Sequence, residues 1–126
     1  MGATQGDSVL VVDDDEDVRS SFAEILRTAG YSVVEARDGF EALEHLRSSP
    51  VAALVLDILM PRLSGLELLD RLDDPPPVLL LTARDYDVYV TGRRSKVYMY
   101  LQKPVPPREL LRAVARATAR GDDVSS

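Results

Sequence analysis

The sequence contains no cysteine and a single histidine, His45. Disulfides, thiolate metal sites and metal or haem ligation by several histidines are therefore excluded. Apolar runs are never longer than a handful of residues, so no segment is expected to span a membrane. Residues 1–7 have neither the apolar core of a signal peptide nor an Arg-rich amphipathic pattern, so we expect a cytoplasmic protein.

Acidic residues outnumber basic ones. With 21 acidic and 15 basic residues among 126, the net charge is -6, which disfavours direct binding of nucleic acid by this domain. The contents of 45% hydrophobic and 29% charged residues are those of one ordinary soluble domain. The acidic residues are unevenly distributed, because Asp13 to Asp17 form an unbroken acidic run.

Short apolar runs alternate with amphipathic segments along the chain. The runs are typical of strands buried on both faces, and they lie at 9–12, 31–34, 53–56, 78–81 and 97–101. Apolar residues at helical spacing follow four of these runs, beginning at Val18, Phe40, Leu66 and Leu110. A further helix is expected within residues 84–96, although that segment contains poor helix formers. This (βα)₅ order predicts an α/β fold, a doubly wound parallel sheet with helices on both faces.

Three segments are expected from this pattern. Residues 1–7 are predicted to be a disordered or extended N-terminus, and residues 8–119 the folded domain. Residues 120–126 are predicted to be a C-terminal tail or the start of a linker.

Polar residues follow four of the five predicted strands at their carboxyl ends. They are Asp13 and Asp14 after the first, Asp57 after the third, Thr82 after the fourth and Lys103 after the fifth. Parallel strands place these ends at one edge of the sheet, where ligands bind. Clustered carboxylates need a proton or a cation among them, and an all-oxygen set suits Mg²⁺ or Mn²⁺.

The side chains of Lys103 and Thr82 are not needed to bind a metal ion. Lys103 and Thr82 offer a positive charge and a hydroxyl donor, which can hold a phosphoryl group beside the ion. An aspartate can itself accept that group as a covalent aspartyl phosphate. The residues therefore predict phosphoryl transfer onto an aspartate.

Four segments together resemble the receiver domain of two-component response regulators, stand-alone or N-terminal and similar to chemotaxis regulators. They are Val9–Asp14, Leu56–Pro61 with Gly65, Leu81–Arg84 and Tyr100–Pro104. The resemblance covers about residues 8–119. It implies a flavodoxin-like fold with strand order 2-1-3-4-5. It also implies a phosphoacceptor domain of phosphorelay signalling, not an enzyme, that catalyses only its own phosphorylation and dephosphorylation.

The resemblance also implies roles for the acidic residues. Asp57 is the phosphoacceptor and receives the group from a phosphohistidine of a sensor histidine kinase or histidine phosphotransfer protein, or from a small phosphodonor. Asp14, Asp57 and the backbone carbonyl of Leu59 bind Mg²⁺ directly, and Asp13 reaches the ion through water.

Further roles are implied for the switch. Lys103 pairs with phosphoryl oxygens, Thr82 bonds one of them after phosphorylation, and Tyr100 then swings inward. This changes the face made by the fourth helix, fifth strand and fifth helix. Whether the protein dimerises through this face is left open. The bond between Lys103 and Pro104 is commonly cis in this family.

Three residues are implied to surround the phosphoryl group. Ala83 leaves room beside it, and Leu59 and Arg84 occupy the positions that tune its hydrolysis. Because Leu59 is apolar, we expect a longer phosphoryl lifetime than with a polar residue there.

The sequence departs from the family pattern before the fifth strand. Lys96-Val97 replaces the usual Gly-Ala pair, and the interval from Thr82 to Lys103 is about one residue short. Both departures concern how the signal is passed on. The kinase, the target and any output domain past Ser126 are left open.

Three alternatives remain at this point. A haloacid-dehalogenase-type phosphatase would explain Asp13-Asp14-Asp15 as an Asp-x-Asp signature, but the chain shows no cap domain and no second acidic motif. A calcium loop would require glycine where Val18 stands. A scaffold that is never phosphorylated lacks support, since every residue of the chemical set is present.

Overall fold

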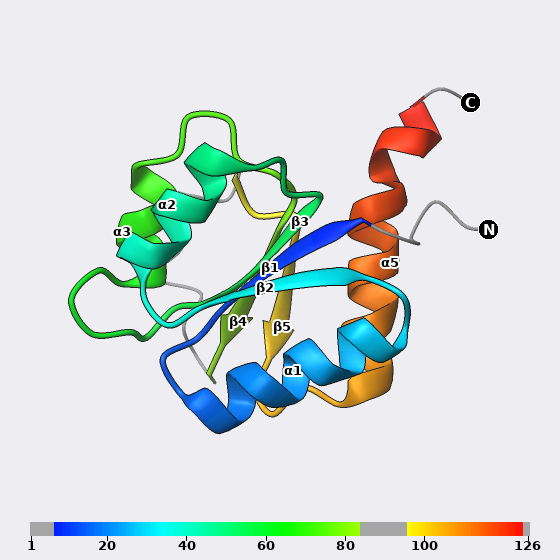
Figure 1. Cartoon of the computed structure of the whole chain (residues 1–126), viewed down its shortest axis with the longest axis horizontal. Coiled ribbons are helices and arrows are strands. Elements are labelled where there is room, and N and C mark those ends of the chain that lie inside the picture. Colours follow the sequence, from blue (N-terminus) through cyan, green and yellow to red (C-terminus); the bar gives the residue numbers. More distant parts are fainter. Residues whose placement is uncertain (1–6, 84–95, 125–126) are drawn as a thin grey trace.

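Five parallel strands form one sheet in the order β2-β1-β3-β4-β5 (Figure 1). This computed structural model describes residues 7–83 and 96–124. The strands are β1 (Ser8–Val12), β2 (Ser32–Ala36), β3 (Ala53–Asp57), β4 (Val78–Thr82) and β5 (Met99–Gln102). The predicted fold class and strand order are confirmed.

Four helices are described, and they carry the labels of Figure 1. They are α1 (Glu16–Thr28), α2 (Gly39–Ser48), α3 (Gly65–Asp70) and α5 (Pro107–Val124). The helix expected within residues 84–96 lies outside the described residues, apart from Lys96. None of the described helices has the length and apolar composition needed to cross a membrane.

The helix α5 continues into the segment that we expected to be a tail or linker. This segment contains Gly121, a residue type of poor helix propensity. That penalty, about 1 kcal/mol, is small once a helix is established, because each further residue adds a backbone hydrogen bond.

Each face of the sheet is covered by two of the described helices. Odd and even residues of a strand point to opposite faces, so the continuous apolar runs supply both. On one face α1 and α5 pack over a core that includes Val9, Val11, Val55, Leu79 and Leu81. On the other, α2 and α3 pack over Leu10, Val12, Leu54, Leu56 and Leu80. Both cores are buried, which fixes the register and hence the positions of the strand ends.

The acidic run also starts α1. Asp15 is the N-cap, and its side chain accepts hydrogen bonds from the backbone N–H groups of Asp17 and Val18, at 2.9 and 3.2 Å. Glu16 and Asp17 then lie in the first turn, where negative charge favours the helix dipole. At the other end Gly30 has φ 105, the left-handed conformation that ends a helix. Asp13 and Asp14 precede the N-cap, so neither of them caps α1.

Phe40 differs from its sequence prediction. The spacing placed it on the buried stripe of α2, but its side chain is 43% exposed. The buried stripe runs through Gly39, Ala42 and Leu43, so Phe40 lies at its margin. Its ring is covered instead by the guanidinium group of Arg62, 5.1 Å from the ring centroid.

Candidate functional site

Three carboxylates meet at the carboxyl edge of the sheet. Asp13 and Asp14 follow β1, Asp57 ends β3, and the register pairs Val12 with Leu56, so the two strands end level. One carboxylate oxygen from each aspartate lies within 4.8 Å of the others. Asp13 and Asp57 are buried, whereas Asp14 is exposed. The site is thus open to solvent on the side of Asp14.

Lys103 supplies the positive charge beside these carboxylates. Its Nζ atom lies 3.2 Å from Oδ1 of Asp57 and 3.3 Å from Oδ2 of Asp13. Its backbone N–H donates to the carbonyl of Thr82 at 2.8 Å, and its bond to Pro104 is cis, as expected. Within residues 7–83 and 96–124, this one cation faces three carboxylates, which leaves an excess of negative charge.

The two carboxylate oxygens of Asp13 differ in their hydrogen bonding. Oδ1 accepts a hydrogen bond from the backbone N–H of Asp15 at 2.9 Å. Oδ2 is buried and, among the described residues, has no donor at hydrogen-bonding geometry, since Lys103 is only within ion-pair range. A buried anionic oxygen without a donor is costly. Hard oxygen donors, excess negative charge and this oxygen together fit Mg²⁺ held in part through water.

Burial and neighbouring charge shift the pKa of two groups. Desolvation and then the charge of Asp13 raise the pKa of Asp57 to about 6, although Lys103 opposes the change. For Lys103, burial lowers the pKa, but the carboxylates of Asp57 and Asp13 outweigh it and the pKa is raised. The lysine is therefore charged at neutral pH, whereas Asp57 ionises at a cost that a nearby cation would reduce.

The side chains surround a small cleft that is large enough for a phosphoryl group. It has a volume of about 260 Å³, and it is lined by Asp13, Asp14, Asp15, Asp57, Ile58, Leu59, Leu81, Ala83 and Lys103. Acceptor, cation and candidate metal ligands thus face one space.

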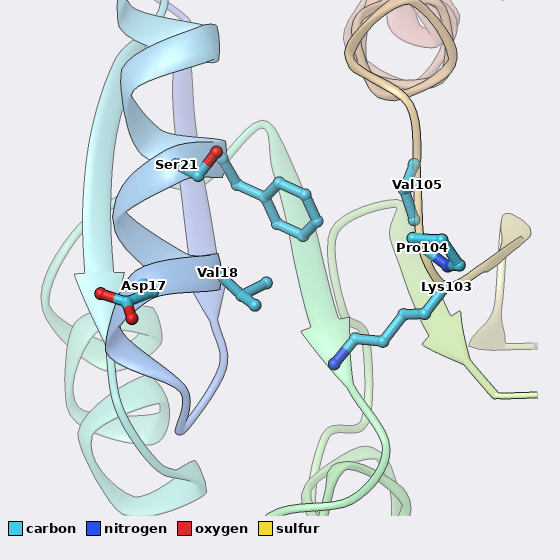
Figure 2. A pocket seen from close by; sticks show the side chains of 7 residues that line it. Asp17, Val18, Ser21, Lys103, Pro104 and Val105 are labelled. Carbon is cyan, nitrogen blue, oxygen red and sulfur yellow. The ribbon is translucent and has the colours of Figure 1, made fainter.

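A second hollow lies next to this cleft. Figure 2 shows it between α1, which carries Asp17, Val18 and Ser21, and the segment after β5 with Lys103 and Pro104. Its volume is about 490 Å³ and its lining is mostly apolar, with Phe22 and Val105 contributing. Lys103 lines both spaces, so the groove lies beside the cleft that contains the carboxylates.

Comparison with known families decides the class of this domain. The family model described as "Response regulator receiver domain" matches residues 9–115. The chain belongs to this family. Relatives of this receiver domain include response regulator MprA from Mycobacterium avium (strain 104), 46% identical over 125 residues, and from Mycobacterium ulcerans (strain Agy99), 47% identical over 122 residues. The alignments cover 94% and 91% of this chain but 55% and 53% of those proteins, so the chain spans about half their length.

Solved structures agree with the architecture of the receiver domain. A putative response regulator from Chloroflexus aurantiacus is 35% identical with a TM-score of 0.82, and the match covers 92% of this chain and all of that one, 100%. A Francisella response regulator receiver domain is 31% identical with a TM-score of 0.84, covering 92% of this chain and 99% of that one.

The other predicted site residues of the receiver domain fall at different depths. Thr82 is buried at the end of β4, at the same edge as the carboxylates. Leu59 and Ala83 line the cleft, and Leu59 is 56% exposed. Tyr100 lies in β5 opposite Leu80 and is 36% exposed. Arg84 lies outside the described residues.

Sequence reasoning missed one contact that holds the site. The Nη1 atom of Arg19 donates to the backbone carbonyl of Asp13 at 3.0 Å, and its Nε donates to Glu35 at 3.2 Å. The guanidinium therefore ties the end of β1 to β2. Its partners lie 6 and 16 residues away, and no local pattern marks such contacts.

Proposed function

We propose that Asp57 of this receiver domain accepts a phosphoryl group in a Mg²⁺-dependent reaction. The observation that carries the proposal is the convergence of Asp13, Asp14, Asp57 and Lys103 on one cleft. An ionised oxygen of Asp57 attacks phosphorus and forms the P–O bond. The bond from phosphorus to the donor's histidine nitrogen, or to the oxygen of a small phosphodonor, breaks, and its electron pair leaves with the donor.

The carboxylates and one carbonyl would hold the metal. Asp14, Asp57 and the backbone carbonyl of Leu59 are assigned as direct ligands, and buried Asp13 as a ligand through water. When bound, Mg²⁺ supplies positive charge to the transferring phosphoryl oxygens. Without the ion, burial and the charge of Asp13 raise the pKa of Asp57 despite the nearby Lys103.

The remaining residues act on the phosphorylated state. Lys103 pairs with a phosphoryl oxygen, and the hydroxyl of Thr82 bonds another. Tyr100 then turns inward from its half-exposed position and alters the surface of β5 and α5. The rest of that face, including Arg84, lies outside the described residues.

The phosphodonor in this proposal is a sensor histidine kinase or a histidine phosphotransfer protein. Its docking surface is the apolar groove of Figure 2, because Lys103 lines both this groove and the cleft. Ser21→Arg would fill the groove, so it should slow transfer from a phosphorylated histidine phosphotransfer protein without changing labelling by acetyl phosphate.

The central proposal is tested by intact mass after incubation with MgCl₂ and acetyl phosphate. The protein should gain one acid-stable, base-labile phosphoryl group, and EDTA or Asp57→Asn should abolish the gain. Asp74→Asn, the same change at an exposed aspartate before β4, should label normally. A folded protein that never labels would be a scaffold. Steady release of phosphate from diverse monoesters would indicate a phosphatase instead.

A further inference from the structure

Arg62, in the loop between β3 and α3, has an unusual backbone conformation. Its φ is 68, and it is the one non-glycine residue with positive φ in the part of the chain that the structure describes. A residue with a Cβ pays a steric cost there. Such a conformation persists only where surrounding contacts enforce it.

The enforcing contacts come from the start of α2. Nη1 of Arg62 donates to Oδ2 of Asp38 at 3.0 Å, and the side chain of Asp38 is almost buried. The other oxygen of Asp38 caps α2 by accepting the N–H of Glu41 at 2.9 Å. The guanidinium also covers the ring of Phe40. Arg62 is thereby fixed to a helix terminus that is itself held in place.

The loop around Arg62 leads directly from the phosphoacceptor. Ile58 is tied at both backbone groups, because its N–H donates to Leu81 at 3.3 Å and its carbonyl accepts from Gly65 at 2.9 Å. Ile58 and Leu63 are buried, whereas Leu59 between them is largely exposed. Apolar burial is non-directional, so it limits the backbone of the loop less than an ion pair at a defined geometry does.

We propose that Arg62 is a positioning residue for the metal site of this receiver domain. Its ion pair with Asp38 fixes the kink of the loop, and the kink sets where the carbonyl of Leu59 points. Arg62 itself touches neither metal nor phosphoryl group. The inference rests on the proposed function, in which that carbonyl is a ligand of Mg²⁺.

A positioning role and a purely electrostatic role of Arg62 predict opposite effects of Arg62→Ala on Mg²⁺ binding. Arg62 and Asp14 line one cleft, so removing the guanidinium makes the surroundings of Asp14 more negative. By charge alone, Arg62→Ala would strengthen cation binding. If Arg62 positions the loop, Arg62→Ala should instead weaken Mg²⁺ binding.

The experiment is a titration of ¹⁵N-labelled full chain with MgCl₂, followed by amide chemical shifts, together with acetyl phosphate labelling rates. Arg62→Ala should raise the Mg²⁺ dissociation constant about threefold to fivefold, because the Arg62 side chain is 65% exposed and an exposed ion pair contributes only modestly. At saturating Mg²⁺ the labelling rate should change less than about twofold, because the acceptor and Lys103 are intact.

Two further variants keep the test independent of folding defects. Asp38→Asn preserves the helix cap but removes the charge of the pair, and it should also weaken Mg²⁺ binding. Arg62→Gly adopts φ 68 without strain and leaves the loop unanchored, so it too should bind Mg²⁺ more weakly. The matched control is Arg37→Ala, which breaks the 3.0 Å pair with Glu41 at the same helix start and should bind Mg²⁺ at least as well as wild type.

Each result then has one meaning. Unchanged or tighter Mg²⁺ binding by Arg62→Ala, or equal weakening by Arg37→Ala, overturns the positioning role while the proposed function stands. A wild-type protein that binds no Mg²⁺ overturns both.

Discussion

Nζ of Lys103 lies 3.2 Å from Oδ1 of Asp57, which joins the segment after β5 to the end of β3. The chain has two lysines, and the other, Lys96, instead donates to the backbone carbonyl of Leu69 at 2.8 Å, at the end of α3. Lys103 is thus the lysine at the acidic site, and Lys96 is a natural control for it.

Replacing Lys103 should impair phosphorylation more than folding. Lys103→Met keeps the length of the side chain and removes its charge, so labelling by acetyl phosphate should slow about 100-fold, as when a transition-state donor is lost. Lys96→Met should label within about twofold of wild type, because its partner is a carbonyl remote from the cleft. Equal rates for Lys103→Met and wild type would remove Lys103 from the mechanism.

Asp57 should make stability depend on pH in the metal-free protein. Its pKa is about 6 in the folded chain and 3.8 ordinarily, so the folded state holds this proton more tightly than the unfolded state. The associated stability is present below the ordinary pKa and is lost as pH rises through about 6.

Urea unfolding in EDTA tests this sign. Asp57→Asn should be more stable than wild type by about 3 kcal/mol near pH 7.5, and the difference should fall to about 1 kcal/mol near pH 4.5. A difference that stays constant over this range would mean that ionisation of Asp57 is not its cause.

Gly65 is required by its closeness to the acceptor strand. A methyl group at this position would overlap the backbone carbonyl of Asp57. Gly65→Ala should therefore destabilise the fold by about 2 to 3 kcal/mol and slow labelling, because β3 or α3 must shift. Gly39→Ala is the comparison, since there the added methyl meets the movable side chain of Leu63 and should cost less. Similar melting temperatures for both variants would contradict this reasoning.

Leu59 should prolong the phosphorylated state. Its exposed apolar side chain lines the cleft and offers no hydrogen bond to an attacking water. Leu59→Asn provides one, and a hydrogen bond of about 1.4 kcal/mol in the transition state would speed dephosphorylation about tenfold. The loss of label after removal of acetyl phosphate measures this rate. Unchanged decay in Leu59→Asn would show that position 59 does not control water here.

The gathering of site residues at one edge was predictable for a simple reason. β1, β3 and β4 are buried on both faces, so their apolar runs end visibly where the chain leaves the sheet and the next polar residue is marked. The run of β5 is only partly buried, but it ends in the same way. Asp57, Thr82 and Lys103 were found in this way. The start of α1 also depends on local sequence, because Asp15 caps it through the N–H groups of Asp17 and Val18.

Contacts between distant segments were not predictable. Phe40 matched the helical spacing of α2, but whether its ring meets the core or the guanidinium of Arg62 depends on how the loop after β3 folds back. The pairing of Arg62 with Asp38, 24 residues apart, has no counterpart in any periodicity.

The sequence by itself determined the α/β class, the strands and the chemical types at their ends, because these follow from local periodicity and composition. The tertiary structure alone decided that Asp13 and Asp57 are buried beside one lysine, that the pKa of Asp57 is raised, and that Arg62 is fixed to α2. Burial and electrostatic coupling depend on distances between segments far apart in the chain, and only packing sets those distances.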